Sequence, residues 1–409
     1  MLNAIWVSFF LVAFLLALIQ FLFAGNLTIF ADLMKAVFDS SKTAFEIALG
    51  LTGVMSLWLG VMKIGERAGF LELLTKLLAP LFARLFPEVP RNHPALGAIT
   101  MNMAANVMGL DNAATPLGIK AMKELQTLNP SQDTASDAQV LFLVINTASV
   151  TLLPVTIFTY RAQLGAADPT DVFIPLLITT YCGTLIGLLT TAFFQRIRLF
   201  DPVTLLYFGG MTAGVAGLAA YFYSLPPDEM QRQSSLLSNF ILFSIVVAFL
   251  GGAVMRKVNA YEAFIEGAKE GFQMAVTIIP YLVAMLVGIA VFRASGGLEM
   301  LTDGMRWLAM QMGWDTRFVD GLPTALMKPL SGSGARAMMI DTMSTHGADS
   351  FAGRLASIIQ GSTETTFYVL AVYFGAVGIQ RIRHAVTCGL IADLGGFVAA
   401  IGVAYLFFG

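Results

Sequence analysis

Several stretches of this chain are long enough and apolar enough to cross a membrane as helices. A helix of about 20 apolar residues spans the hydrocarbon layer of a bilayer. Uncharged stretches of about that length lie at Ile5–Phe23, Phe173–Phe194, Val203–Tyr223 and Leu236–Met255. Of the 409 residues 57% are hydrophobic and 12% charged, with a mean hydropathy of +0.75, whereas soluble domains are about a quarter charged. The sequence therefore predicts an all-α integral membrane protein.

Several function classes find no support in the sequence. The net charge of −2 and the lack of a basic cluster speak against a nucleic-acid partner. Cys182 and Cys388 lie in apolar stretches, and the three histidines are scattered, so neither a disulfide framework nor a metal site is expected. No phosphate-binding G-x-x-x-x-G-K-[ST] motif occurs. With no catalytic constellation either, we expect neither an enzyme nor a bound cofactor.

The chain shows signs of an internal repeat at an offset of 227 residues. Ala44–Thr75 and Gly271–Thr302 share eight identities in 32 positions, including Gly69 with Gly296. Each half then carries a polar, interrupted stretch, an apolar segment with a polar centre, and a last apolar span. Many transporters are built from two related halves. The sequence therefore predicts two structural repeats joined by a linking hairpin.

The charge distribution indicates how these repeats cross the membrane. If both interrupted stretches are re-entrant hairpins, about eight transmembrane helices remain and the halves have inverted orientations. With the N-terminus in the cytoplasm, 14 of the 24 Lys and Arg residues fall inside and 8 outside, in keeping with the positive-inside rule. A parallel arrangement with full crossings is the alternative. The expected divisions are an N-terminal helix and loop at 1–42, repeats at 43–200 and 258–409, and a linking hairpin at 201–257.

The first interrupted stretch, "NMAANVMGLDNAATPLGIKAM", combines amides with helix breakers. Asn102 and Asn106 are four residues apart and face one way on a helix. Gly109 breaks the run before Asp111 and Asn112. Non-helical backbone in a membrane survives only where it faces protein or a water-filled cavity. We expect these side chains either to line a site or to cap and join helices.

The second interrupted stretch, "PLSGSGARAMMID", places two serines and two glycines before an arginine. Its glycines permit a non-helical crossing, and a helix is expected to restart near Ala335. The N-terminus of such a helix carries partial positive charge and suits an anionic group. Ser331, Ser333 and Arg336 are therefore predicted to bind a solute.

Ionisable residues inside apolar segments cost about 2.5 to 3.5 kcal/mol on insertion and are functional candidates. Glu364 stands among threonines in "QGSTETTFYVLAVYFG" and is predicted to be a buried carboxylate that binds a cation or carries a proton. The alternative is a structural pair between Glu364 and Arg336. In the first half "NTASVTLLP" occupies the matching place and contributes Asn146.

From about Phe45 to the C-terminus, the sequence resembles known families. "LFPEVPRNHPALGAITMNMAANVMGLDNAATPLGIKAMKELQ" resembles spore maturation protein A, and "LMKPLSGSGARAMMIDTMSTHGADSFAGRLASIIQGSTETTFYVLAVYFGAVGIQRIRH" resembles spore maturation protein B. These families carry the nucleoside recognition, or Gate, domain, which is shared with concentrative nucleoside transporters and the membrane part of ferrous-iron transporter B. The resemblance implies a transport-like fold with re-entrant hairpins, and it leaves the solute open.

Together these features predict a secondary transporter in the bacterial inner membrane, with its site between the two hairpins. The solute is expected to be small and polar, anionic or zwitterionic, with a nucleoside-like molecule among the candidates. The alternatives are a membrane scaffold or sensor and a flippase for a lipid-linked carrier. Membrane lipid is the other expected partner, a homo-oligomer is left open, and transport is expected to be coupled to Na⁺ or H⁺. The predicted solute ligands are Asn102, Asn106, Asn112, Asn146, Ser331, Ser333, Arg336 and Thr363, and the predicted coupling residues are Glu364, Asp111 and Asp341.

Overall fold

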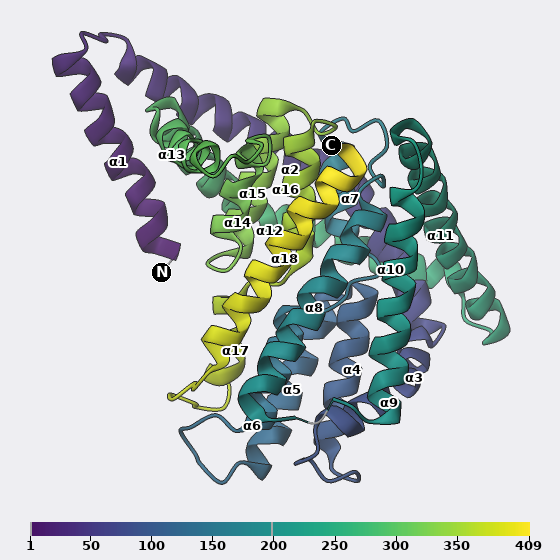
Figure 1. Ribbon diagram of the computed structural model, residues 1–409. Helices are drawn as coiled ribbons and strands as arrows, with labels where there is room; N and C mark the ends of the chain where they lie inside the picture. The colour runs from purple at the N-terminus through teal and green to yellow at the C-terminus, as the bar shows by residue number, and fades with distance from the viewer. Residues whose placement is uncertain (1, 198) are drawn as a thin grey trace. The chain divides into compact units, whose positions relative to one another are not determined.

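The chain is helical along most of its length, as the apolar stretches predict (Figure 1). A computed structural model describes residues 2–197 and 199–409, without the side chains of Asp111 and Asn112. Within these residues there is no named β-strand, only an isolated bridge between Thr134 and Arg381. The helices form two compact units, each assembled from separate segments of the chain.

The first unit takes its helices from both ends of the chain. It comprises the residues up to Trp58, Thr156–Pro169 and Ala268–Gln360. Trp6 donates its indole N–H to the carbonyl of Ala284 at 2.8 Å, which ties the N-terminal helix to the rest of the unit. Its elements are α1 (Leu2–Phe23), most of α2 (Ile29–Arg67), α7 (Val155–Gln163), most of α12 (Ala260–Ala294), α13 (Gly297–Gln311), η2 (Val319–Gly321), α14 (Leu322–Met327), α15 (Gly332–His346) and α16 (Phe351–Ser362).

The second unit is built around two long apolar helices, α8 (Phe173–Gln195) and α18 (Ala385–Phe408), which run side by side (Figure 1). It comprises Leu59–Val155, Thr170–Gly267 and Gly361–Gly409. Its other elements are α3 (Phe70–Leu85), α4 (Pro94–Met108), α5 (Asp111–Leu128), α6 (Asp137–Thr147), α9 (Pro202–Thr204), η1 (Leu205–Gly209), α10 (Gly210–Tyr223), α11 (Pro227–Met255) and α17 (Thr366–Gly375), together with the remaining ends of α2 and α12.

Seven of the described helices, taking α9, η1 and α10 as one, are long and apolar enough to cross a membrane. The sequence predicts about eight. Two expected crossings are interrupted: α6 and α7 are separated by residues 148–154, and α16 and α17 by residues 363–365. None of these four helices reaches the 18 residues of a continuous span. The polar centres seen in the sequence are therefore breaks in the helices.

Both halves of the chain present the same succession of helices. In each, a long helix ends at a glycine in the left-handed region, Gly69 with φ 81° and Gly296 with φ 79°, and an amphipathic helix follows. Short helices with two interruptions come next, then a long final span. The repeat itself, its inverted orientation and the re-entrant crossing of the hairpins stay predictions.

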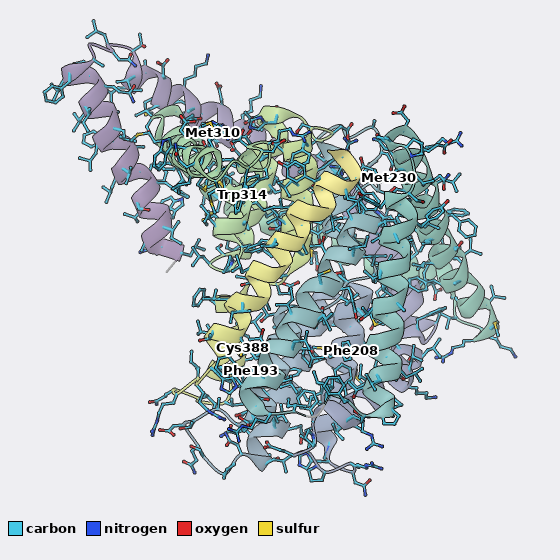
Figure 2. All side chains as sticks on the ribbon, in the orientation of Figure 1. Phe193, Phe208, Met230, Met310, Trp314 and Cys388 are labelled. Carbon is cyan, nitrogen blue, oxygen red and sulfur yellow. The ribbon has the colours of Figure 1, made fainter. Side chains whose placement is uncertain are left out.

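The amphipathic helices α3 and α13 bury one face and expose apolar side chains on another. In α3, Leu81 and Phe82 are buried, whereas Leu73 and Leu77 are exposed. Met310 of α13 and Trp314, which follows the helix, are also exposed (Figure 2). Exposed apolar side chains on a helix with a polar face are typical of a position at a membrane interface.

Glycines allow α2 and α12 to approach closely. A Cβ atom at Gly267 would lie 2.3 Å from the carbonyl oxygen of Leu59, and a Cβ at Gly271 would lie 2.7 Å from the Cα of Ser56. Small residues at such crossings let helix backbones pack against each other in a membrane.

We expect Gly267→Ala to lower the free energy of unfolding by about 2 kcal/mol, because overpacking forces the two helices apart. Denaturant titration of the purified protein in mixed micelles measures this change. Gly251→Ala in α11 is the matched control, since its Cβ would meet no described heavy atom within 4 Å. Equal stability of the two variants would contradict the close packing.

Candidate functional site

The first hairpin turns at Gly109, between α4 and α5. This glycine has φ 72° and closes α4, with its N–H donating to the carbonyls of Ala105 and Asn106. A Cβ atom here would lie only 2.4 Å from the carbonyl oxygen of Leu153. Leu152 of the same segment donates its N–H to Val107 at 2.8 Å. The turn of the hairpin therefore packs directly against the break between α6 and α7.

The asparagines predicted to bind solute lie together, and they are bonded to one another. Asn146 of α6 donates to the side-chain oxygen of Asn102, while Asn106 donates to Asn146 at 3.1 Å. Asn102 also donates to the carbonyl of Ala114 at 2.7 Å, and Tyr373 of α17 donates to Asn146 at 3.4 Å. Asn102 and Asn146 are buried. The cluster joins α4, α5, α6 and α17, which is the helix-joining role that the sequence also allowed.

Two further predicted site residues of this hairpin, the coupling residue Asp111 and the solute ligand Asn112, lie at the start of α5. Their side chains are outside the described part of the chain. Their roles stay predictions.

The two helix breaks meet within the second unit. The N–H of Glu364, between α16 and α17, donates to the carbonyl of Thr147 at the end of α6, at 2.6 Å. Thr184 of α8 donates its hydroxyl to the carbonyl of Ala148. These bonds satisfy backbone groups that the missing helical turns leave open, and an unsatisfied group in hydrocarbon costs several kcal/mol.

The break at residues 363–365 contains Thr363, Glu364 and Thr365, whose side chains all carry oxygen atoms. Thr363 is buried, and its hydroxyl has no hydrogen-bond partner among the described residues. Glu364 is exposed, so the prediction of a buried carboxylate is wrong. The reason is that Glu364 lies in a non-helical link, outside the packed faces of α16 and α17.

A buried carboxylate does lie beside this break, on α18. Asp393 is 1% exposed and accepts a hydrogen bond from the hydroxyl of Thr366 at 2.5 Å. In the sequence Asp393 is an ionisable residue inside an apolar span, and its nearness to the break depends on the packing of α17 against α18. Asp393 is the carboxylate that sequence reasoning left out of the site.

The second hairpin places Ser331 at the N-terminus of α15. The Ser331 hydroxyl accepts from the N–H of Gly334 at 3.0 Å and lies 3.2 Å from the hydroxyl of Ser333. The helix restarts at Gly332 rather than near Ala335, because this serine caps it. Lys328, just before the turn, is buried and donates to the carbonyl of Gln360 at 2.7 Å.

Arg336 and Asp341 of α15 have different surroundings. The Arg336 guanidinium lies over the ring of Tyr160, 5.7 Å from the centroid, and its buried Nε has no hydrogen-bond partner among the described residues. Asp341 forms an ion pair with Arg293 of α12. The predicted coupling residue Asp341 is therefore already neutralised, whereas among the described residues of the same unit no carboxylate pairs with Arg336.

The predicted solute and coupling residues divide between the two units. Ser331, Ser333, Arg336 and Asp341 belong to the first unit, and Asn102, Asn106, Asn146, Thr363 and Glu364 belong to the second. A single site shared by both hairpins, and the alternative pair between Glu364 and Arg336, stay predictions.

A structural arginine that the sequence does not single out organises the first unit. The side chain of Arg161, at the end of α7, is fully buried. It donates to the carbonyl of Ala348 at 2.7 Å and pairs with Asp349 at 3.2 Å. It also bonds the carbonyls of Asp168 and Pro169. Arg161 thereby fixes the turn between α15 and α16.

The helices, their two pairs of interruptions and the polar groups at them define a membrane protein of a transporter-like family. The chain matches the nucleoside recognition (Gate) family over residues 48–163 and 275–380. Because these segments make up more than half of the chain, it belongs to that family.

Two curated relatives each match part of the chain. Spore maturation protein B of Bacillus subtilis (strain 168) is 48% identical over 165 residues, which are 40% of this chain and 91% of the relative. Spore maturation protein A of the same organism is 38% identical over 198 residues, 48% of this chain and 97% of the relative. No solved structure matches the chain. The chain thus resembles both proteins, which confirms the resemblance noted in the sequence.

Proposed function

We propose that the protein is a secondary transporter of a small anionic or zwitterionic solute, coupled to H⁺ or Na⁺. It would lie in the bacterial inner membrane with its N-terminus in the cytoplasm. No organic cofactor, and no metal ion other than a coupling Na⁺, takes part in this proposal.

The observation that carries the proposal is the meeting of two helix breaks in the second unit. Breaks at membrane depth are tolerated where the backbone faces protein or a water-filled cavity, and in transporters they mark the binding region. Here the Glu364 to Thr147 backbone bond joins the two breaks, and the exposed carboxylate of Glu364 follows Thr363, whose hydroxyl has no hydrogen-bond partner in the described part of the chain. Glu364 would bind or release the coupling cation, and the buried Asp393 is the second candidate for this role.

The solute class follows from the charge of the second hairpin. Among the described residues of its unit, Arg336 has no carboxylate partner, and it lies four residues after Gly332, where α15 begins, close to the helix N-terminus that favours an anion. Lys328, which is buried, adds a second cation just before the helix. These groups suit a carboxylate or phosphate on the solute, which includes nucleoside-like molecules that carry such a group.

Uptake into proteoliposomes tests the proposal. The purified protein is reconstituted and offered labelled nucleosides, nucleotides, amino acids and carboxylic acids, with an imposed H⁺ or Na⁺ gradient. We expect accumulation of at least one solute, and we expect Glu364→Gln to lower its initial rate about tenfold or more, equivalent to about 1.4 kcal/mol in activation free energy. The gradient-driven part of the uptake should disappear in this variant.

Glu262→Gln, which changes an exposed carboxylate of α12 in the same unit, is the matched control and should transport normally. Absence of flux over the whole panel, with correctly folded protein in the vesicles, would make transport the wrong class.

The asparagine cluster favours a second candidate, a membrane scaffold or sensor. A scaffold is expected to pair its polar groups with one another, as Asn102, Asn106 and Asn146 do. This candidate predicts ligand or partner binding without flux, and a Glu364→Gln variant that behaves like the wild type in every transport measurement.

A further inference from the structure

A pocket of about 490 Å³ opens in the second unit, away from the helix breaks and hairpins. It lies between the end of α3, the loop at residues 86–93, the start of α6 and the end of α8. Helix α8 and the span that begins at Pro202 are both long and apolar enough to cross a membrane. The pocket is therefore located where two spans reach the membrane surface.

Most acidic side chains that line the pocket already form ion pairs or hydrogen bonds within the protein. Asp137 pairs with Arg383 at 2.6 Å. Asp201 caps α9 by accepting from the N–H groups of Val203 and Thr204, and these bonds, with the hydroxyl of Thr204 foremost, lower its pKa. Arg84 lies 4.0 Å from Asp201. These partners leave little free negative charge in the pocket.

Two arginines of the pocket have no such partner. Arg91 and Arg196 both line it, and within the described residues neither forms an ion pair or a side-chain hydrogen bond. Glu88 is the remaining acidic group, and its pKa is raised by burial and by the nearby Asp137. The pocket therefore contains two guanidinium groups without an ion-pair partner among the described residues, and one carboxyl group with a raised pKa.

Two large, exposed apolar side chains lie close in sequence to residues that line the pocket. Phe193, near the end of α8, is 81% exposed, and Phe200, in the loop before α9, is 90% exposed (Figure 2 labels Phe193). Aromatic side chains are enriched at the level of the lipid headgroups, and basic pockets between membrane helices bind phosphate-bearing headgroups. Exposed phenylalanines thus precede Gln195 and Asp201, which line the pocket, and are suited to contact acyl chains.

We propose that this pocket binds a phosphate ester, with Arg91 and Arg196 as the ligands of its phosphate. Guanidinium groups form strong, bidentate hydrogen bonds with phosphate oxygens. The exposed phenylalanines favour an anionic phospholipid as the source of the phosphate over a soluble ester. This site is separate from the proposed transport site and does not depend on transport.

Binding to the full-length purified protein tests this proposal. Dioctanoyl phosphatidylglycerol and glycerol 3-phosphate are titrated separately in a detergent without phosphate. We expect the double variant Arg91→Gln/Arg196→Gln to bind the lipid about tenfold more weakly or worse, because two charge-assisted hydrogen bonds are lost. Glu88→Gln should bind it about threefold more tightly, because it removes a like charge from the pocket.

The double variant Lys120→Gln/Lys257→Gln is the control, since it removes two exposed cations outside the pocket. It should bind like the wild type, and unchanged size-exclusion profiles should show that every variant is folded. Lipid binding that is tighter than glycerol 3-phosphate binding supports a headgroup site, and equal binding supports a phosphate site for a soluble ester. No binding of either compound, or equal losses in both double variants, would overturn the proposal.

Discussion

Arg161→Met is expected to lower the free energy of unfolding by about 3 to 5 kcal/mol, the range for breaking a buried ion pair from one side. The fully buried guanidinium holds the carbonyls of Ala348, Asp168 and Pro169 as well as the carboxylate of Asp349. Methionine fills much of the volume but donates no hydrogen bond, so these acceptors lose their partner. The variant would have a lower denaturation midpoint in mixed micelles and faster proteolysis in the turn between α15 and α16.

Lys42→Met is the comparison for this experiment within the same unit. Lys42 is 78% exposed and pairs only with Glu46 at 3.7 Å along one helix turn, an interaction that contributes little. If Arg161→Met were no more destabilised than Lys42→Met, the fixing of the turn by Arg161 would be wrong.

Gly109→Ala is expected to cost about 3 kcal/mol, the sum of two effects. A non-glycine residue in the left-handed region costs about 1 to 2 kcal/mol, and the added Cβ would lie 2.4 Å from the Leu153 carbonyl, which requires the hairpin turn to move. The same displacement would disturb the 2.8 Å bond from Leu152 to Val107. We therefore expect a lower unfolding midpoint together with reduced uptake.

Gly97→Ala in α4 provides a control on the same helix. It is helical, and a Cβ atom there would meet no described atom within 4 Å, so its stability should stay the same or rise slightly. A Gly109→Ala protein as stable as Gly97→Ala would show that the close approach to Leu153 is not needed.

The sequence predicts the membrane spans well because their signal is local. A run of about 20 apolar residues has few alternatives to a membrane helix, and α8, α11 and α18 confirm this. Gly109 and Ser331 are also visible in the sequence, since a glycine and a small polar residue are what a helix end requires. The all-α class and the family follow from such local patterns.

Long-range partners have no comparable signal. Arg161 looks like a surface charge at the end of an apolar segment, yet its main partners lie 187 and 188 residues away. Glu364 looks buried because it stands among small threonines at the edge of an apolar segment, yet the break takes it out of the packed helix faces. Asp393 acquires its place beside the break only through the contact between α17 and α18. Each of these outcomes depends on tertiary packing, which the spacing of residues along the chain does not encode.

Each compact unit takes helices from both halves of the chain. Arg161 of α7, from the half that resembles spore maturation protein A, completes the turn at Ala348 in the other half, while Tyr373 of α17 reaches Asn146 in the first half. Neither half separately contains all the segments of a folded unit. Because both halves are translated as one chain, they are produced in equal amounts. No unpaired half is left for proteases to degrade.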